Sequence, residues 1–170
     1  MSYIERNISP ILKDRVQKSK CTLVVGARQV GKSTLIKHEF SEYNWTNFDD
    51  RLTRIQAKEE PKLFFLNNLC PLFIDEVQKE GAILEEIKQI VDESDERGQF
   101  ILSGSQKLEL IKGISESLAG RVSIFELSGL SMREIKKIKF NKHFVPTEDY
   151  LKEREKELKK YDNVWEIIHK

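Results

Sequence analysis

One stretch of this sequence decides the fold: Gly26-Ala27-Arg28-Gln29-Val30-Gly31-Lys32-Ser33, which fits the pattern G-x-x-x-x-G-K-[ST]. The glycines let the backbone curl tightly, so that successive N–H groups point inward at an anion. A helix that begins near Lys32 would add its positive N-terminal end to the same place. The stretch therefore predicts a phosphate-binding loop, which requires a strand before it and a helix after it.

Both flanking elements are predicted from the sequence. Residues 22–25 form a short apolar run that ends at Gly26, as is typical of a strand buried on both faces, and residues 32–40 are predicted to form a helix. Further strands are predicted over residues 44–48, 72–74, 100–102 and 122–125, and further helices from Ser9 onward, over 51–57, 62–66 and 83–91, and from Ser131 onward. This alternation predicts an α/β fold with a parallel sheet covered by helices on both faces.

Several residues are predicted to start or stop these helices. Ser9 is expected to cap the first helix, with Pro10 at the first helical position. Gly98 is expected to stop the helix that contains residues 83–91. Ser131 and Glu134 have the spacing of a capping box, which predicts a helix start at this point.

Two acids follow the predicted strand over residues 72–74, and they complete a nucleotide site. Asp75 at the strand end is expected to hold Mg²⁺, together with the hydroxyl of Ser33. Glu76 is placed to act as general base on an attacking water, and Lys32 to reach the β- and γ-phosphates. The predicted nucleotide-binding set is Gly26, Ala27, Arg28, Gln29, Val30, Gly31, Lys32, Ser33 and Thr34. The predicted cofactors are therefore ATP and Mg²⁺.

Composition excludes several classes of protein. A chain of 170 residues with a net charge of +1 is large enough for one globular domain, and it gives no electrostatic indication of nucleic acid. No apolar run approaches the ~20 residues of a membrane helix, and no signal peptide is visible, so a cytoplasmic location is expected. The two cysteines are expected to be free thiols, and the three histidines have no metal-ligand spacing.

The order of the motifs resembles that of a known family. The motifs are Gly26 to Thr34, Ile74-Asp75-Glu76-Val77-Gln78, Leu102-Ser103-Gly104-Ser105, Leu118-Ala119-Gly120-Arg121 and Ser131-x-x-Glu134. Together they resemble the N-terminal domain of prokaryotic AAA-type ATPases that carry a second domain of unknown function. The family more often has Thr-Gly-Ser where this chain has Ser103-Gly104-Ser105. The resemblance implies a three-layer α/β/α sandwich with strand order 5-1-4-3-2.

The resemblance also implies further roles. An extra strand between the two motif strands would carry Ser103 at its tip, near the γ-phosphate and the water, with Ser105 as the second candidate. Arg121 would reach into the γ-phosphate of a neighbouring subunit, which implies a homo-oligomer. Arg28 could act similarly within one chain, and residues 3–8 could pack on the adenine.

The domain organisation follows from these assignments. Residues 1–130 are expected to form the ATPase domain, and residues 131–170 a helical extension that leads into a further domain. An unidentified protein partner is also expected. Hydrolysis of ATP coupled to a conformational change is the leading hypothesis. The alternatives are a nucleotide-gated interaction module with little hydrolysis, a small-molecule phosphotransferase, and a GTP switch. A GTP switch requires Asn-Lys-x-Asp, whereas Asn141-Lys142 is followed by Phe144 at the fourth position.

Overall fold

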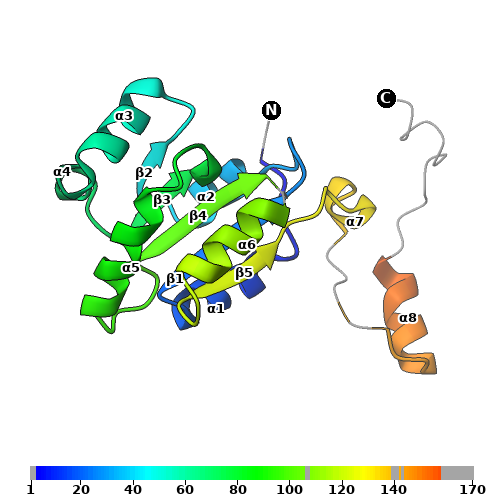
Figure 1. The fold of residues 1–170 in the computed structure, drawn as a ribbon. Helices are drawn as coiled ribbons and strands as arrows, with labels where there is room; N and C mark the ends of the chain where they lie inside the picture. The colour runs from blue at the N-terminus through cyan, green and yellow to red at the C-terminus, as the bar shows by residue number, and fades with distance from the viewer. Residues whose placement is uncertain (1–2, 106–107, 139–141, 143, 158–170) are drawn as a thin grey trace. The chain divides into compact units, whose positions relative to one another are not determined.

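The computed structural model describes residues 3–105, 108–138, 142 and 144–157 (Figure 1). The strands are β1 (Cys21–Gly26), β2 (Asn44–Asn47), β3 (Leu72–Asp75), β4 (Phe100–Ser105) and β5 (Val122–Glu126). The helices are α1 (Ser9–Lys18), α2 (Lys32–Glu39), α3 (Arg51–Glu59), α4 (Pro61–Asn67), the 3₁₀ helix η1 (Val77–Lys79), α5 (Ile83–Glu93), α6 (Leu108–Ser117), α7 (Met132–Ile135) and α8 (Glu148–Glu157).

The five strands form one parallel sheet in the order β2-β3-β4-β1-β5. This is the predicted order 5-1-4-3-2 read from the other edge, so the predicted topology is confirmed. The predicted insertion of an extra strand is also confirmed, because β4 pairs with β1 on one side and with β3 on the other. The carboxyl ends of β1, β4 and β3 therefore meet at one edge of the sheet.

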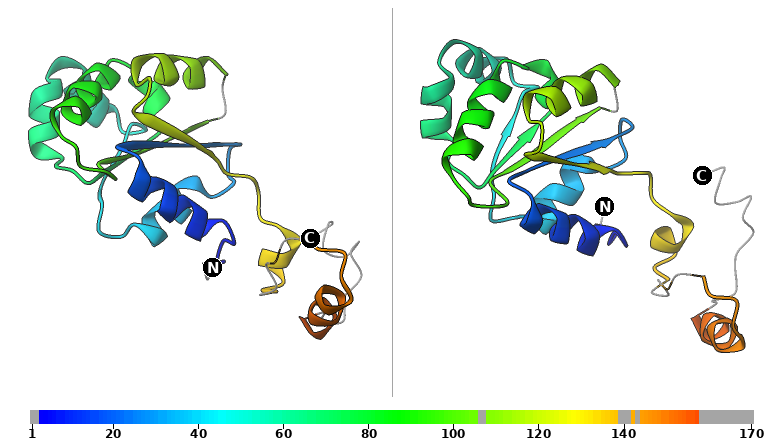
Figure 2. Two further views of the ribbon diagram at one scale, coloured as in Figure 1. Left: turned by 90° about the horizontal axis from the view of Figure 1, so that it is seen from below. Right: turned by 60° about the horizontal axis from the view of Figure 1, so that its bottom comes forward.

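Helices cover both faces of the sheet, and this confirms the predicted sandwich. Figure 2 shows α1 and α2 against one face and α5 and α6 against the other. Each face has its own apolar core, and residues of β1 alternate between them: Leu23 and Val25 belong to one cluster, and Val24 to the other. All three side chains are almost fully buried, and each contributes about 1.5–3 kcal/mol to stability through burial.

Two predicted helix boundaries are wrong. Ser9 is the first residue of α1 and does not cap it, because the carbonyl of Ile8 accepts the first hydrogen bonds, from Ile11 and Leu12. The Ser9 hydroxyl is buried, and it has no hydrogen-bond partner among the described residues. Pro10 consequently stands at the second helical position and not at the first.

Gly98 does not stop α5, since that helix ends at Glu93 and Ser94 is already extended. Gly98 has a φ of +68° in the turn that leads into β4, and its N–H donates to the Ser19 carbonyl at 2.7 Å. A Cβ atom at this position would lie 2.9 Å from the Tyr43 hydroxyl. The glycine therefore serves the close approach of three segments at the start of the sheet.

The chain divides into two compact units, residues 8–129 and residues 1–7 together with 130–170. In the second unit, Ser131 and Glu134 form the predicted capping box at the start of α7. The Glu134 carboxylate also accepts hydrogen bonds from the Asn7 N–H at 2.8 Å and from the Arg6 guanidinium at 3.2 Å. One buried carboxylate thus joins the N-terminal segment to α7.

Among the helices of the described residues, none combines the length and the apolar character that crossing a membrane requires.

Candidate functional site

The phosphate-loop stretch connects the carboxyl end of β1 to the first residue of α2. Gly31 has a φ of +89° and Gln29 a φ of +64°, so the loop turns through left-handed conformations just before the helix starts at Lys32. The Lys32 side chain is buried, and its amine donates to the carbonyl oxygens of Gly26 at 3.1 Å and Ala27 at 3.0 Å. The amine is therefore held above the loop, at the positive end of α2.

Gly26 is needed for a reason that the sequence pattern does not reveal. The N–H of Leu127, directly after β5, donates to the Val25 carbonyl at 2.8 Å. This brings the Leu127 backbone so close that a Cβ atom on Gly26 would lie 2.3 Å from the Leu127 carbonyl oxygen. The first glycine of the pattern thus allows two backbone segments, the start of the loop and the residues after β5, to lie in close contact.

Asp75 is held at the end of β3 by the neighbouring strand. Its side chain is 5 % exposed, and one carboxylate oxygen, Oδ1, accepts a hydrogen bond from the hydroxyl of Ser103 in β4. The Glu76 N–H donates to the same oxygen at 3.2 Å. Two donors therefore fix the orientation of this carboxylate.

Glu76 adopts a left-handed backbone conformation, with φ 57° and ψ 41°, where the chain turns from β3 into η1. Such a conformation is unfavourable for a residue with a Cβ atom and is concentrated at functional sites. The side-chain amide of Gln78 donates to the Glu76 carboxylate. The other polar atom of Gln78, Oε1, is buried and has no hydrogen-bond partner in the described part of the chain.

Gln78 was quoted above only as part of a motif, and its contact with Glu76 was not predicted. The two residues are separated by one position in η1, where neither helical nor strand periodicity brings side chains together. The tight turn at Glu76 brings the two side chains into contact. In the sequence, a polar residue two positions after an Asp-Glu pair is only a weak signal for such a contact.

The structure thus brings together the loop after β1, Asp75 at the end of β3 with Glu76 directly after it, and Ser103 in β4. Ser103 lies opposite Val24 inside a strand that is three residues longer than predicted, so it is not a tip residue. Ser105, the second candidate, is the last residue of β4 and lies opposite Gly26. The other predicted loop residues are partly or fully exposed at this edge: Ala27, Arg28, Gln29, Val30, Ser33 and Thr34.

The chemistry of these groups fits a magnesium nucleotide. Main-chain N–H groups at a helix start and a buried lysine amine favour phosphate oxygens. A buried carboxylate and a serine hydroxyl supply the oxygen ligands that Mg²⁺ prefers. Among the described residues, no group of three or more His, Cys, Asp or Glu side chains is arranged to hold a metal ion.

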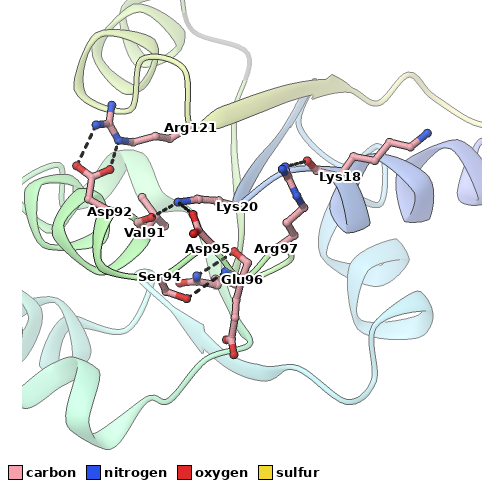
Figure 3. Close-up of polar contacts among 10 residues, drawn as sticks. Lys18, Lys20, Val91, Asp92, Ser94, Asp95, Glu96, Arg97 and Arg121 are labelled. Atoms are coloured by element: carbon pink, nitrogen blue, oxygen red, sulfur yellow. Dashed lines mark hydrogen bonds and ion pairs between the residues drawn. The ribbon is translucent and has the colours of Figure 1, made fainter.

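Arg121 is not part of this edge. It directly precedes β5, and its carbonyl accepts a hydrogen bond from the Cys21 N–H, so it lies at the amino end of the strands. Its guanidinium forms a two-pronged ion pair with Asp92 of α5, with Nη2 at 2.9 Å from Oδ2 (Figure 3). The hydrogen bond from Arg121 lowers the pKa of Asp92 below its ordinary value. Any role for Arg121 at a nucleotide must therefore involve another subunit.

The cysteine prediction is confirmed. Cys21 and Cys70 are both free thiols. Cys21 is buried, and burial raises the pKa of its thiol far above the ordinary value, whereas Cys70 is exposed. His38 is exposed on α2, and His143 and His169 lie outside the described residues.

Comparison with known proteins agrees with this geometry. A sequence model for the family described as "AAA domain" matches residues 18–136. The uncharacterized proteins Rv2008c of Mycobacterium tuberculosis and Mb2031c of Mycobacterium bovis are each 30% identical to this chain over 131 residues. These matches cover 76% of this chain, and the chain spans about 30% of the length of these curated relatives.

A solved structure has the same fold. The Walker-type ATPase Paby2304 of Pyrococcus abyssi aligns with a TM-score of 0.51 at 15% identity, over 78% of this chain and 55% of that one. At this identity the likeness concerns the fold alone.

Proposed function

Because this chain belongs to the AAA domain family, we propose that it binds ATP with Mg²⁺, hydrolyses it to ADP and phosphate, and couples this reaction to a conformational change. The family and the fold support nucleotide binding by a P-loop of the AAA type. The observation that carries the finer proposal is the meeting of Lys32, Asp75 and Glu76 at the carboxyl edge of one parallel sheet.

Each side chain has a distinct proposed role. The loop N–H groups and the Lys32 amine bind the β- and γ-phosphates, for which the amine exchanges its contacts with the Gly26 and Ala27 carbonyls. Ser33 and Asp75 hold Mg²⁺, which neutralises phosphate charge when it is bound. Glu76 accepts the proton of the attacking water. Gln78 orients the Glu76 carboxylate.

The hydrogen bond from Ser103 supports this assignment. It ties the Asp75 carboxylate to β4, so that the two lone pairs of Oδ1 are directed at Ser103 and at the Glu76 N–H. Because both hydrogen bonds fix the carboxylate group through Oδ1, they also fix the direction of its other oxygen, Oδ2. We propose that Ser103 positions Asp75, in addition to any contact with the γ-phosphate.

Several finer assignments remain proposals of the same kind. Arg121 acts in a neighbouring subunit of a homo-oligomer, for which it must leave Asp92. Residues 1–130 form the ATPase domain and residues 131–170 an extension toward a further domain, which accords with the greater length of the relatives, although residues 1–7 belong to the same compact unit as residues 130–170. A cytoplasmic location and an unidentified protein partner stay predictions.

A thermal-shift titration with Mg-ATP, Mg-GTP or no nucleotide tests this function. A ligand at a hundredfold excess over its Kd stabilises a protein by roughly 2.7 kcal/mol, which is readily detected. The shift with ATP should exceed that with GTP and should vanish in Lys32→Ala. Lys37→Ala is the matched control, because Lys37 lies in the same helix with its amine over the Trp45 ring. If Lys32→Ala shifts as much as the wild type, the assigned site is wrong.

A further inference from the structure

A cavity lies at the edge of the sheet opposite the proposed nucleotide site, in the same unit, where the strands begin. Its volume is about 490 Å³. It is lined by basic, small and polar residues: Lys18, Ser19, Lys20, Asp92, Arg97, Ala119, Gly120, Arg121, Val122 and Ser123. The proposed nucleotide site does not use this cavity, since that site lies at the carboxyl ends of the strands.

The sheet topology brings these residues together from three distant segments. The strands β4, β1 and β5 are neighbours, and Phe100, Cys21 and Val122 lie side by side in register. The segments that lead into the three strands are therefore adjacent, and they carry Arg97, Lys20 and Arg121. Figure 3 shows the three residues on these adjacent segments, each directed at its own partner: Arg121 at Asp92, Lys20 at Val91 and Asp95, and Arg97 at the Lys18 carbonyl.

Hydrogen bonds fix the three segments to one another. The Gly98 N–H donates to the Ser19 carbonyl at 2.7 Å, and the Gln99 N–H donates to the Lys20 carbonyl at 3.0 Å. The Cys21 N–H donates to the Arg121 carbonyl at 3.3 Å. The backbone around the cavity is therefore part of the sheet and not a loose surface loop.

The charges of the lining do not balance. Lys20, Arg97 and Arg121 are three of the cations that line the cavity; the fourth, Lys18, forms an ion pair with Asp14 at 2.7 Å, and Figure 3 shows its side chain extending away from the others. Among the described lining residues Asp92 is the one acid, and it is paired with Arg121. Arg97 donates to the Lys18 carbonyl oxygen, which carries no net charge, and no carboxylate of the described residues forms an ion pair with it. The Lys20 amine donates to the Val91 carbonyl at 2.8 Å and lies 3.4 Å from Asp95, whose side chain is fully exposed.

From this arrangement we propose that Lys20, Arg97 and Arg121 form a binding site for a compact oligophosphate anion. Guanidinium and ammonium groups that line one cavity favour phosphate oxygens, and arginine can bind two of them at once. The hydroxyls of Ser19 and Ser123 add donors to the same lining. None of the described residues that line the cavity is aromatic, so they offer a nucleobase no ring on which to stack, and single-stranded nucleic acid is a poorer fit to this lining.

Such an anion has two sources. One is a free oligophosphate in solution. The other is the phosphate chain of a nucleotide bound to a second copy of this chain, and only this source rests on the function proposed above. In both cases Arg97 and Lys20 bind the phosphate oxygens together with Arg121, so the proposed site consists of three cationic side chains and not of Arg121 alone.

Calorimetric titration with sodium tripolyphosphate, without divalent metal, tests the site in the Lys32→Ala chain. This background disables the phosphate loop, so the result does not depend on whether the chain hydrolyses ATP. Arg97→Gln and Lys20→Gln should each weaken binding at least tenfold, and higher salt should weaken it in all chains. Asp92→Asn should tighten binding, since it removes the competing carboxylate. Lys62→Gln, on the exposed surface of α4, is the matched control and should change nothing.

A second arm separates the two sources and does not require Lys32→Ala to fold. Sedimentation of the wild-type chain and Arg97→Gln is compared at high protein concentration with Mg-ATP. Binding of free tripolyphosphate that Arg97→Gln weakens identifies the free anion as the ligand. Self-association that requires ATP and is lost in Arg97→Gln, without binding of the free anion, identifies the second copy. If Arg97→Gln alters neither measurement, the proposal is overturned.

Discussion

The hydroxyl of Ser103 donates a hydrogen bond to Oδ1 of Asp75, across two neighbouring strands of the sheet. Ser103 is fully buried and Asp75 is 5 % exposed, so this contact forms away from water. A hydrogen bond to a charged acceptor in such a place is stronger than one at the surface. The carboxylate proposed to hold Mg²⁺ is thus positioned by the strand that separates β3 from β1.

Replacing Ser103 by alanine should leave Asp75 less well oriented. We expect Ser103→Ala to lower the free energy of unfolding by about 2 kcal/mol, because the charged acceptor loses a buried donor. It should also raise the Mg²⁺ concentration needed for half-maximal ATP turnover. Urea denaturation and a magnesium titration measure the two effects. Ser41→Ala, at an exposed serine before β2, is the control, and equal effects of both changes would contradict the positioning role.

Glu76→Gln should separate nucleotide binding from hydrolysis. The amide keeps the shape of the side chain but cannot accept a proton, so we expect kcat to fall about a hundredfold or more. The thermal shift with Mg-ATP should remain as in the wild type. Glu80→Gln, beyond η1, serves as the matched control for loss of one acid in this segment. Unchanged turnover in Glu76→Gln would remove Glu76 from the mechanism.

The two glycines Gly26 and Gly113 should respond to alanine with opposite signs. A Cβ atom on Gly26 would lie 2.3 Å from the Leu127 carbonyl oxygen, and backbone must move to relieve the clash. We expect Gly26→Ala to destabilise the fold by about 3 kcal/mol. Gly113 lies inside α6, where an added Cβ meets nothing within 4 Å, so Gly113→Ala should stabilise the fold by about 1 kcal/mol. Urea denaturation of both variants decides between these signs.

The Glu134 carboxylate should make stability depend on pH in the acid range. Burial alone would raise its pKa, but the N–H groups of Ser131 and Asn7 and the nearby Arg6 guanidinium together lower the pKa below the ordinary value of 4.5. A lowered folded-state pKa means that the unfolded chain binds the proton more tightly. The stabilisation is therefore complete above about pH 5.5, and it is lost as the pH falls through the folded-state pKa.

Glu134→Gln tests this linkage. The variant should be about 2 kcal/mol less stable than the wild type at pH 7, and the difference should shrink as the pH falls below 4.5. Urea denaturation between pH 7 and pH 3 follows it, together with hydrogen exchange at the Asn7 amide, which should become faster. Glu5→Gln, on the exposed N-terminal segment, is the control. A difference that does not vary with pH would show that the carboxylate is not the titrating group.

Much of the fold was predictable because its signals are local. The strand over residues 72–74, the helix over residues 83–91 and the loop between Gly26 and Ser33 are each specified by neighbouring residues. The parallel arrangement followed from apolar strands that alternate with helices. The helix α6 over residues 108–117 was not predicted, since the residues just before it, which include Ser103-Gly104-Ser105 of β4, give no clear cap signal.

Errors arose where a local signal met a tertiary constraint. Serine is a common cap residue, but Ser9 is buried inside the first turn of α1. Gly98 does not end a helix; it leaves room for the Tyr43 hydroxyl, which a Cβ atom would approach too closely. Arg121 was assigned from its place in the order of motifs. The structure adds its ion pair with Asp92, 29 positions away, which any action on a neighbouring subunit must first break.

The sequence by itself determined the phosphate loop, the Asp75-Glu76 pair and the parallel sheet, because tight turns, helix starts and buried strands depend on residues that are close in the chain. Only the tertiary structure decided that Ser103 holds Asp75, that Glu134 holds Arg6 and that Arg97 lies beside Lys20. Ser103 and Asp75 are 28 positions apart, and Glu134 and Arg6 are 128 apart. No local periodicity encodes such pairs, since they form only when the tertiary fold brings distant segments of the chain together.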